Sequence, residues 1–337
     1  MSTSSTTTTT NSNDAYRAVR VPSAGPSSIM RLETLPPLAN PNRGEIAVLV
    51  KYSGVNPVET YIRSGAYASV PPYPYTPGGC LSGIVTSVGE GVEKFSIGDR
   101  IYSARTVSGS YAERALINAS FAWHLPSSIG FAEGAALGVP YHTAYRAVFT
   151  KARVKRNQTI LVHGASGAVG VACVQMAKSA GCRVIGSAGS EAGSKAIAEY
   201  CDVVIPHGDV NRVLEFTNGA GVDSIIEMAA HKNLGADLKM LVTGGTVVVV
   251  GSRGPIEVNP RDVMSRESTI TAVMLWHATP EEFNEAAEYI ADGLKSSKLK
   301  PLVGQVFEGL EKAADAHDEV IEHAKGTVGK IVIRVAH

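Results

Sequence analysis

Cysteine is scarce in this sequence, and its few cysteines are widely spaced. The 337 residues include four of them, with no CxxC pair, at Cys80, Cys173, Cys182 and Cys201. That spacing argues against a disulfide framework and favours a reducing compartment. The nine histidines include no pair four residues apart with an accompanying glutamate, and no cysteine cluster adds ligands to them. We therefore predict that the protein has no metal site.

Net charge and long apolar runs are also missing. Lysine plus arginine and aspartate plus glutamate each total 31 residues, so the chain has no general attraction to nucleic acid or to a membrane surface. No apolar run approaches the roughly 20 residues that span a bilayer. Nine of the first ten residues are Ser or Thr, so we expect residues 1–13 to be disordered rather than a targeting signal. These absences predict a cytoplasmic protein.

What the sequence does contain is two regions of different texture. Apolar residues make up 44% and charged residues 18%, as in ordinary globular proteins, and 337 residues are enough for two domains. From Ala15 to about Pro126, short β-rich runs separated by Gly, Pro and Ser predict a mostly antiparallel, barrel-like β domain. The expected strands of this region are Tyr16–Val21, Glu45–Tyr52, Gly83–Val88, Arg100–Tyr102 and Tyr111–Leu116.

Beyond Phe131 the pattern changes to a regular alternation of strands and helices. A helix is expected at Glu133–Ala147, and Val- and Ile-rich runs then alternate with helical segments. This alternation is typical of a doubly wound α/β fold, whose parallel sheet is covered on both faces. The expected strands are Thr159–Val162, Arg183–Gly186, Val203–Ile205, Val222–Met228, Thr246–Val250 and Thr269–Leu275. The expected helices between them are Ser190–Tyr200, Val210–Thr217 and Leu234–Val242.

The C-terminal segment predicts two more helices and a strand. Thr279, Pro280 and Glu282 form a capping box with proline at the first helical position, so a helix begins there. A second helix is expected over Leu310–Ala324. The last strand, Lys330–Val335, has no partner in the alternating region. We therefore expect it to return to the N-terminal β domain and to make that domain discontinuous.

A glycine-rich turn follows the first strand of the alternating region. Gly164, Gly167 and Gly170 come after the buried strand Thr159–Val162, and a helix with a stripe of small apolar residues follows them. Such a turn can cradle a dinucleotide, because backbone amides and the helix N-terminus attract the pyrophosphate. The GxxGxxG spacing also fits an ordinary strand–turn–helix, and the surrounding alternation favours the dinucleotide interpretation.

The end of the second alternating strand predicts which dinucleotide binds. NAD-selective sites place an acidic residue there to bind the adenosine ribose. Here Arg183–Ser190 contains no acid before Glu191, so the 2′-phosphate of NADP(H) meets no repulsion. Lys195 and His207 are candidate contacts for that phosphate, although an ordinary solvated helix lysine is the alternative for Lys195. Use of both NAD and NADP is the alternative for the site as a whole.

A second turn ends the strand Thr246–Val250. Ligands of open α/β sheets lie outside the carboxyl ends of the strands, so Gly251, Ser252 and Arg253 are expected beside the nicotinamide half of the cofactor. A purely structural turn is the alternative.

Several longer segments resemble one family. They are Gly54–Gly65, Tyr75–Gly78, Leu161–Gly167, Val250–Gly254 and Asn259–Asp262. In this order they resemble the zinc-free quinone oxidoreductases of the medium-chain dehydrogenase/reductase superfamily, in the branch that includes zeta-crystallin. The similarity extends from about Ala18 to Val335, which is nearly the whole chain.

The resemblance implies a fold and a reaction. It implies a discontinuous GroES-like β-barrel catalytic domain, at residues 14–137 and 277–337, and a Rossmann NADP(H)-binding domain at residues 138–276. It also implies zinc-independent, NADPH-dependent reduction of quinones. Zinc-bearing relatives have a cysteine and a Gly-His-Glu motif where this chain has Val55-Asn56 and Gly78-Gly79-Cys80. This difference agrees with the absence of a metal site expected from the cysteine and histidine spacing.

The resemblance also implies which residues bind NADPH. They are Tyr61, Ser166, Gly167, Ala168, Val169, Gly189, His207, Asn233, Val250, Gly251, Ser252, Arg253, Val273, Met274 and Leu275. The chain departs from its relatives at two of these places. Ala168 stands where relatives often have glycine, and the loop before His207 is one residue shorter than in zeta-crystallin.

The substrate side of the site is less defined. A quinone or conjugated enone that accepts a hydride develops negative charge on oxygen, which needs a nearby donor. Asn56 and Tyr61 are the candidates to orient the substrate, since relatives place their segment beside the nicotinamide. Packing or turn formation is the alternative, because an Asn-Pro pair is also typical of a turn.

Other functions and partners stay open. Reduction of 2-alkenals or enones would use the same cofactor geometry, and relatives of zeta-crystallin also serve as RNA-binding or structural lens proteins. Zero net charge and the lack of an aromatic–basic motif argue against RNA as the main partner. The strand Thr269–Leu275 is expected at a sheet edge, where it invites pairing with a second copy. We therefore expect a homodimer or a tetramer that acts on a small molecule.

Overall fold

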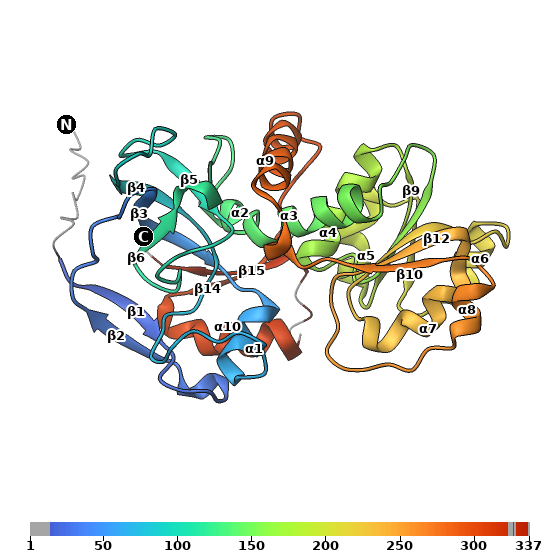
Figure 1. The fold of residues 1–337 in the computed structure, drawn as a ribbon, viewed down its shortest axis with the longest axis horizontal. Coiled ribbons are helices and arrows are strands. Elements are labelled where there is room, and N and C mark those ends of the chain that lie inside the picture. Colours follow the sequence, from blue (N-terminus) through green and yellow to red (C-terminus); the bar gives the residue numbers. More distant parts are fainter. Residues whose placement is uncertain (1–13, 323–325, 327, 336–337) are drawn as a thin grey trace.

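The computed structural model describes residues 14–322, 326 and 328–335, and it forms two lobes (Figure 1). One lobe contains the N- and C-terminal parts of the chain, and the other contains its middle. The predicted disorder of residues 1–13 and the end of the helix predicted to reach Ala324 lie outside the described residues. Among the described residues, no helix combines the length and the apolar character needed to cross a bilayer.

The first lobe is built on a seven-stranded, mostly antiparallel sheet, as predicted. Its strand order is β14-β15-β3-β4-β5-β7, with β6 paired to β3 and with β1 and β2 in a separate sheet. These strands are β1 (Tyr16–Arg20), β2 (Arg31–Leu35), β3 (Glu45–Gly54), β4 (Cys80–Val88), β5 (Arg100–Ser103), β6 (Arg114–Asn118), β7 (Ala122–His124), β14 (Val303–Glu308) and β15 (Lys330–Arg334). The strand predicted from Tyr111 begins only at Arg114, because the Tyr111 amide donates to the Pro77 carbonyl instead of to a neighbouring strand.

The last strand closes this lobe. β15 runs antiparallel to β3, with Val332 opposite Gly54, so the predicted return of the C-terminus to the β domain is confirmed. β14 lies parallel to β15 on its outer side. β2 and β14 were not predicted, because most of their side chains are exposed or half-buried and no alternating apolar pattern marks them.

The second lobe contains a parallel sheet of six strands, as predicted. Its order is β10-β9-β8-β11-β12-β13. The strands are β8 (Thr159–Val162), β9 (Arg183–Ala188), β10 (Val203–Pro206), β11 (Val222–Glu227), β12 (Leu241–Val249) and β13 (Thr269–Ala272). The helices that connect them are α4 (Ala168–Ser179), α5 (Glu191–Ile197), α6 (Val210–Phe216), α7 (Ala230–Met240) and α8 (Pro260–Met264). All six strands lie between residues 138 and 276, while the domain boundaries themselves stay a prediction.

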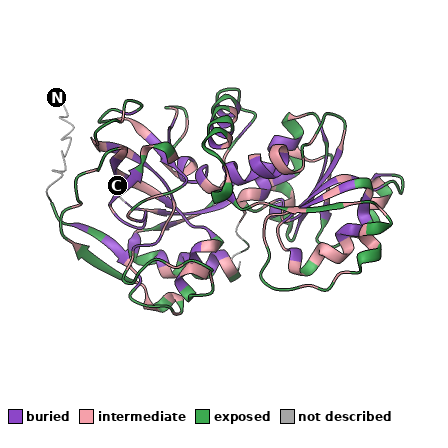
Figure 2. Cartoon of the chain, in the orientation of Figure 1, coloured by how far each residue is buried: buried purple, intermediate pink, exposed green. Residues whose placement is uncertain are grey.

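Both faces of this sheet are buried. Ile160 and Val162 of β8 belong to the core that contains α4, whereas Leu161 belongs to the core that contains residues of α6 and α7. Figure 2 shows these strands as largely buried. Because alternate side chains enter two different cores, an uninterrupted apolar run is the pattern that such a strand requires.

Two boundaries predicted in this lobe are wrong. Leu241 and Val242 were expected in a helix, but Leu241 pairs with Val222 and begins β12, since its fully buried side chain packs in the sheet core. The strand expected to reach Leu275 ends at Ala272. Beyond it the Met274 carbonyl accepts a hydrogen bond of 2.5 Å from the Arg146 side chain, and a 3₁₀ turn follows.

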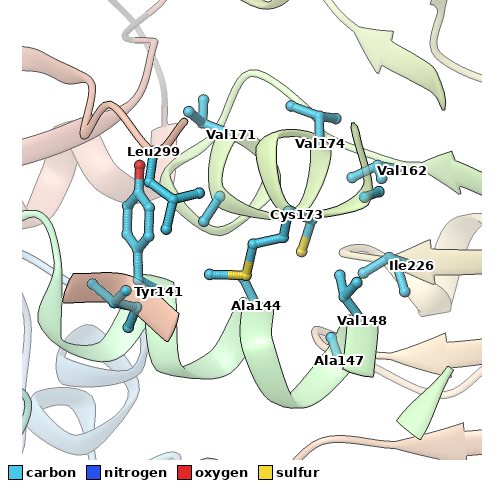
Figure 3. Packing of buried hydrophobic residues seen from close by; sticks show 14 of the residues in the cluster. Tyr141, Ala144, Ala147, Val148, Val162, Val171, Cys173, Val174, Ile226 and Leu299 are labelled. Carbon is cyan, nitrogen blue, oxygen red and sulfur yellow. The ribbon is translucent and has the colours of Figure 1, made fainter. Parts of the chain in front are cut away.

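The helix predicted at Glu133–Ala147 is divided in the structure. It comprises α2 (Phe131–Ala135), α3 (Gly138–Tyr145) and a π-helical turn at Arg146–Lys151. Pro140 is tolerated because α3 begins two residues before it, where a missing amide hydrogen costs no helical bond. Figure 3 shows α3 against α4, with Ala144 and Cys173 among the side chains between them. The four cysteines are free thiols, as expected without a disulfide framework.

The remaining helices lie in the terminal segments. α1 (Pro57–Ser64) follows β3, and α10 (Ala313–Glu322) follows a short 3₁₀ turn. α9 (Pro280–Lys295) begins with the predicted capping box: the Thr279 hydroxyl accepts from the Glu282 amide at 3.3 Å, and the Glu282 carboxylate accepts from the Thr279 amide at 3.0 Å.

Leu161→Ala tests the importance of the doubly covered sheet. Leu161 is fully buried at the centre of β8. We expect this substitution to lower the free energy of unfolding by about 2–5 kcal/mol, because it removes apolar contacts and leaves a cavity. Urea unfolding followed by circular dichroism measures the change. Ile97→Ala is the control, since Ile97 is 72% exposed and its truncation should cost less than about 0.5 kcal/mol. Equal losses in the two variants would contradict this account of the core.

Candidate active site

The parallel strands end along one edge of the sheet, and most predicted cofactor residues follow those ends. The strand order places β8 and β11 side by side at the point where the winding direction reverses, which is where ligands of such sheets bind. The residues that follow strand ends are Ser166, Gly167, Ala168 and Val169 after β8, Gly189 after β9, His207 after β10, Val250, Gly251, Ser252 and Arg253 after β12, and Val273, Met274 and Leu275 after β13. Asn233 and Lys195 lie on α7 and α5.

The glycine turn has the geometry of an anion cradle. Gly164 has φ +55°, and a Cβ on Gly170 would lie 2.2 Å from the Gly164 carbonyl oxygen, so neither position accommodates a side chain easily. Gly167 is exposed and is the N-cap of α4, where no side chain of a described residue caps the helix. The amides of the first turn of α4 are therefore available to a phosphate. Ala168 fits without strain as the first residue of this helix.

The end of β9 forms the adenosine side of the cradle. Gly189 is exposed, and a Cβ built on it would lie 3.0 Å from the Nε2 atom of His207. Ser190 caps α5 by accepting a hydrogen bond of 3.1 Å from the Gly193 amide. Lys195 is exposed and forms an ion pair of 2.6 Å with Glu191 one turn earlier on α5. The structure thus brings His207 to the strand end and gives Lys195 a partner on its own helix.

The expected nicotinamide side joins the two lobes. The Arg253 side chain reaches the Ile321 carbonyl of α10 at 3.5 Å, and Tyr67, which follows α1, reaches the Met274 sulfur at 3.8 Å. The Gly329 amide donates to the Ser166 carbonyl at 2.7 Å, directly beside the glycine turn. The cradle is therefore tied to β15 of the first lobe. Leu275 is buried in the core of the second lobe.

Asn56 lies in a buried polar cluster at the start of α1. Its Oδ1 accepts from the Lys330 ammonium at 2.5 Å, and its Nδ2 donates to Glu59 at 2.8 Å and to the Cys80 sulfur at 3.4 Å. Burial lowers the pKa of Lys330, while the nearby Cys80 and Glu59 raise it. Tyr61, on the same helix, is half-buried, and its hydroxyl has no hydrogen-bond partner among the described residues. The substrate-orienting roles of Asn56 and Tyr61 stay predictions, and Lys330 was not anticipated from the sequence.

A second buried cluster that the sequence reasoning missed lies beneath the glycine turn. His163 directly follows β8, Glu227 is the last residue of β11, and Asp237 lies on α7. All three side chains are buried. The Nε2 atom of His163 is 2.9 Å from Asp237 and 3.5 Å from Glu227. Burial raises the pKa of Glu227 to about 7 and that of Asp237 to about 7. A histidine and an acid at the ends of neighbouring strands were visible in the sequence, but their pairing depends on the strand order.

This cluster has ligand types suited to a metal ion, with donor atoms all within 4.8 Å of one another. Bonds of about 2.0–2.2 Å to a tetrahedral zinc ion would hold two such atoms more than about 3 Å apart. The 2.9 Å between His163 and Asp237 fits a hydrogen bond better. We therefore treat the cluster as a hydrogen-bonded one, and the absence of a metal site stays a prediction.

Comparison with known proteins identifies the family. A model described as an alcohol dehydrogenase GroES-like domain matches residues 42–127, and one described as a zinc-binding dehydrogenase matches residues 168–292. The quinone oxidoreductase of Rattus norvegicus is 45% identical over 321 residues, which cover 94% of this chain and 97% of that protein. The quinone oxidoreductase of Homo sapiens is 43% identical with the same coverage.

The chain belongs to the quinone oxidoreductase family.

Solved structures agree with this assignment. The quinone oxidoreductase of Escherichia coli complexed with NADPH has a TM-score of 0.85 and 28% identity, covering 94% of this chain and 99% of that one. A mycobacterial protein complexed with NADPH has a TM-score of 0.86 and 29% identity, covering 95% and 99%. The predicted GroES-like β-barrel with a doubly wound Rossmann domain is thereby confirmed, as is membership of the medium-chain dehydrogenase/reductase superfamily.

Gly170→Ala tests the cradle of this oxidoreductase. Its Cβ would lie 2.2 Å from the Gly164 carbonyl oxygen and 2.7 Å from the Ala165 Cα, so the turn must open. We expect NADPH affinity to fall by about tenfold or more and the free energy of unfolding to fall by about 1–3 kcal/mol. Fluorescence titration with NADPH and urea unfolding measure the two effects.

Gly235→Ala is the matched control for that substitution. Gly235 lies within α7, and nothing lies within 4 Å of a Cβ added there. We expect unchanged NADPH affinity and a gain of about 0.5–1 kcal/mol in stability, because alanine favours the helix interior. Unchanged NADPH binding by the Gly170→Ala variant would refute the role assigned to the turn.

Proposed function

We propose that this protein is an NADPH-dependent reductase of quinones that works without zinc. The observation that carries the proposal is the glycine turn at the N-terminus of α4, exposed at Gly167 and beside a strand end that has no acidic residue. The similarity to quinone oxidoreductases, and to two solved structures complexed with NADPH, supports the same function.

The residues present fit this cofactor. The uncapped first turn of α4 supplies amides for the pyrophosphate, with Ser166, Gly167, Ala168 and Val169 around it. The end of β9 offers Gly189, the Ser190 hydroxyl and the Nε2 atom of His207, and none of these groups is a carboxylate that would repel a phosphate. Asn233 lies on the helix after β11. Lys195 lies on the helix after β9 and is proposed as a further contact, although it pairs with Glu191 in this structure.

The nicotinamide half is assigned to the region between the lobes. Gly251, Ser252 and Arg253, which follow β12, and the Val273–Leu275 segment, which follows β13, are proposed to contact it. Bound NADPH would supply a hydride to an electron-poor quinone. The chain's own task is to hold the substrate over this region, to exclude water and to meet the charge that develops on the substrate oxygen. Tyr61, whose hydroxyl is uncommitted, is the proposed donor, and Asn56 is proposed to shape the site from within the cluster around Lys330.

The same cluster supports the proposal that the protein works without zinc. Cys80 is fully buried, and burial raises the pKa of its thiol, which disfavours the thiolate form that binds metals. The Lys330 ammonium already places a positive charge beside Asn56, within this cluster.

Assembly and location remain proposals. β13 is an edge strand of the parallel sheet, as predicted, and its Ile270 is 41% exposed. An apolar edge strand can pair with the same strand of a second copy, so we propose a homodimer. A zeta-crystallin-like protein of this kind would act in the cytoplasm on a small molecule, and the neutral charge of the chain gives no support to RNA binding as its main role.

Substrate class is tested by steady-state kinetics with NADPH and two acceptors. We expect kcat/KM for 1,2-naphthoquinone to exceed that for a 2-alkenal by about tenfold or more. The oxyanion left by hydride addition to a quinone takes its proton on oxygen from solvent, whereas an alkenal must be protonated at carbon. Preference for the alkenal would favour the alternative function, reduction of 2-alkenals or enones. Salt-sensitive binding of AU-rich RNA, without turnover of either acceptor, would favour a non-catalytic role.

Cofactor choice is tested at Ser190. Ser190→Asp keeps a good N-cap for α5 and adds a carboxylate at the end of β9. We expect the ratio of kcat/KM for NADPH over NADH to fall by about tenfold or more, since the carboxylate repels the 2′-phosphate and can bind the ribose. Ser190→Asn is the control, because it caps the helix equally well without charge. A similar loss in both variants would refute the electrostatic explanation.

A further inference from the structure

A continuous chain of hydrogen bonds runs beneath the cradle to the adenosine side. The Oγ atom of Ser187, which is fully buried on β9, is 3.0 Å from the Nδ1 atom of His207 and 3.3 Å from the Nδ1 atom of His163. The same oxygen lies 3.3 Å from the amide of Gly164, the first glycine of the turn. On its other side the His163 ring reaches Asp237 at 2.9 Å. We call the three side chains His207, Ser187 and His163 the relay.

The chain continues to a second residue expected at the cofactor. Glu227 lies beside Asp237, and both of its oxygens are 3.2 Å from the Nδ2 atom of Asn233. The second oxygen of Asp237, Oδ2, is buried and has no hydrogen-bond donor among the described residues. The mechanism proposed above uses none of these buried groups. Their arrangement nevertheless links His207 and Asn233, two residues expected at the cofactor.

The Ser187 hydroxyl can form only a limited set of hydrogen bonds, so its bonds to the two histidines must run in opposite directions. A hydroxyl has one hydrogen to donate and accepts two hydrogen bonds at most. Since the Gly164 amide must donate to it, Ser187 accepts from one of the two histidines and donates to the other. When the Nδ1 atom of His163 carries a proton, Ser187 accepts it and donates to the Nδ1 atom of His207. The proton of a neutral His207 then lies on Nε2.

The opposite state reverses each bond. When the Nδ1 atom of His163 carries no proton, Ser187 donates to it and must accept from the Nδ1 atom of His207. The Nε2 atom of a neutral His207 then has only a lone pair. This nitrogen lies beside Gly189, where the phosphate-bearing ribose is expected. An Nε2–H group binds a phosphate oxygen, whereas a lone pair repels it.

We propose that the protonation state of the buried His163–Glu227–Asp237 cluster sets, through Ser187, whether His207 presents a donor or a lone pair to the 2′-phosphate of NADPH. In this proposal His163, Ser187, Glu227 and Asp237 are positioning residues, and the cluster makes the preference for NADPH over NADH depend on pH. The inference rests on the proposed function for its ligand, but the relay itself is a property of the free protein.

The cluster has groups that titrate near neutral pH. Burial raises the pKa of both carboxyl groups to about 7, while burial lowers the pKa of His163 although Glu227 opposes that effect. The three side chains therefore titrate together, and the cluster loses protons as pH rises through about 7. Below that pH an added proton can reside on the Nδ1 atom of His163. Above it, His163 donates only toward Asp237, so the relay reverses.

Burial and nearby positive charge favour the neutral form of His207. Burial lowers the pKa of His207, and positive charge on His163 or on Lys232 of α7 lowers it further. Asp209, the N-cap of α6, also faces the cluster across a small cavity that Asp237 and Asn233 line. A neutral His207 has two tautomers, and its partner at Nδ1 decides between them.

The tautomer of His207 can be measured in the protein without cofactor. Nitrogen-15 NMR of the histidine rings distinguishes a proton on Nε2 from one on Nδ1. From about pH 6 to about pH 8.5, we expect the proton of His207 to move from Nε2 to Nδ1 with a midpoint near pH 7. A single tautomer of His207 over the whole range would overturn the proposal.

Two variants separate the relay from the titration of His207 itself. In Ser187→Ala the pH-dependent change of tautomer should disappear, whereas Ser224→Ala, a buried serine of the same sheet outside the relay, should retain it. In Asp237→Asn the cluster has one carboxyl group fewer, so the midpoint should move to lower pH or vanish. An unchanged transition in Ser187→Ala or in Asp237→Asn would contradict the proposal.

Cofactor affinity supplies an independent readout. We expect the Kd for NADPH to rise by about tenfold from pH 6 to pH 8.5, the cost of one lost charge-assisted hydrogen bond, while the Kd for NADH stays constant. The phosphate itself gains negative charge over this range, and Ser187→Ala, which should show no such weakening, corrects for that effect.

Equal pH dependence for NADPH and NADH would overturn the proposal. Failure to bind NADPH at any pH would instead refute the proposed function, and the NMR result would still decide the relay.

Discussion

Parallel pairing of the six strands is the constraint on which the candidate site depends. It directs the carboxyl ends of the strands, including β8, β9, β11 and β12, to one edge, so turns that are remote in the sequence become neighbours. The same pairing buries both faces of β8 and holds Gly164 against Gly170, because the following helix must return tightly onto the sheet. The cradle, the acid-free strand end and the buried cluster beneath them are all consequences of this alignment.

Much of this architecture could be predicted from local sequence. The apolar run at Thr159–Val162, the three glycines and the Thr279 capping box each depend on neighbouring residues, and the structure has them where they were expected. The return of the last strand was predicted by elimination, since the alternating region had no partner for it. The predictions failed where a contact between distant residues decides the conformation. One example is Arg146, which donates to the Met274 carbonyl just after β13, where the predicted strand was too long.

The candidate site divides in the same way. Backbone features were predictable, because glycine spacing and the lack of an acid after β9 are local properties. The two buried clusters were not. Lys330 contacts Asn56 across 274 positions of the chain, and His163 contacts Asp237 across 74, so neither pair has a sequence signature. Charged side chains are rarely buried without partners, which makes such residues visible only once the fold brings their partners together.

Because the first lobe is discontinuous in sequence, its sheet is completed late in synthesis. Synthesis proceeds from the N-terminus, so the second lobe has all six of its strands once residue 272 has been added. The C-terminal half of β3 still lacks its neighbour at that moment, because β15 comprises residues 330–334. The nascent protein therefore holds a complete nucleotide-binding sheet beside an open barrel with an unpaired strand edge, a form prone to association with other chains. Once β15 has been made, it can close that edge and bring Gly329 to the glycine turn.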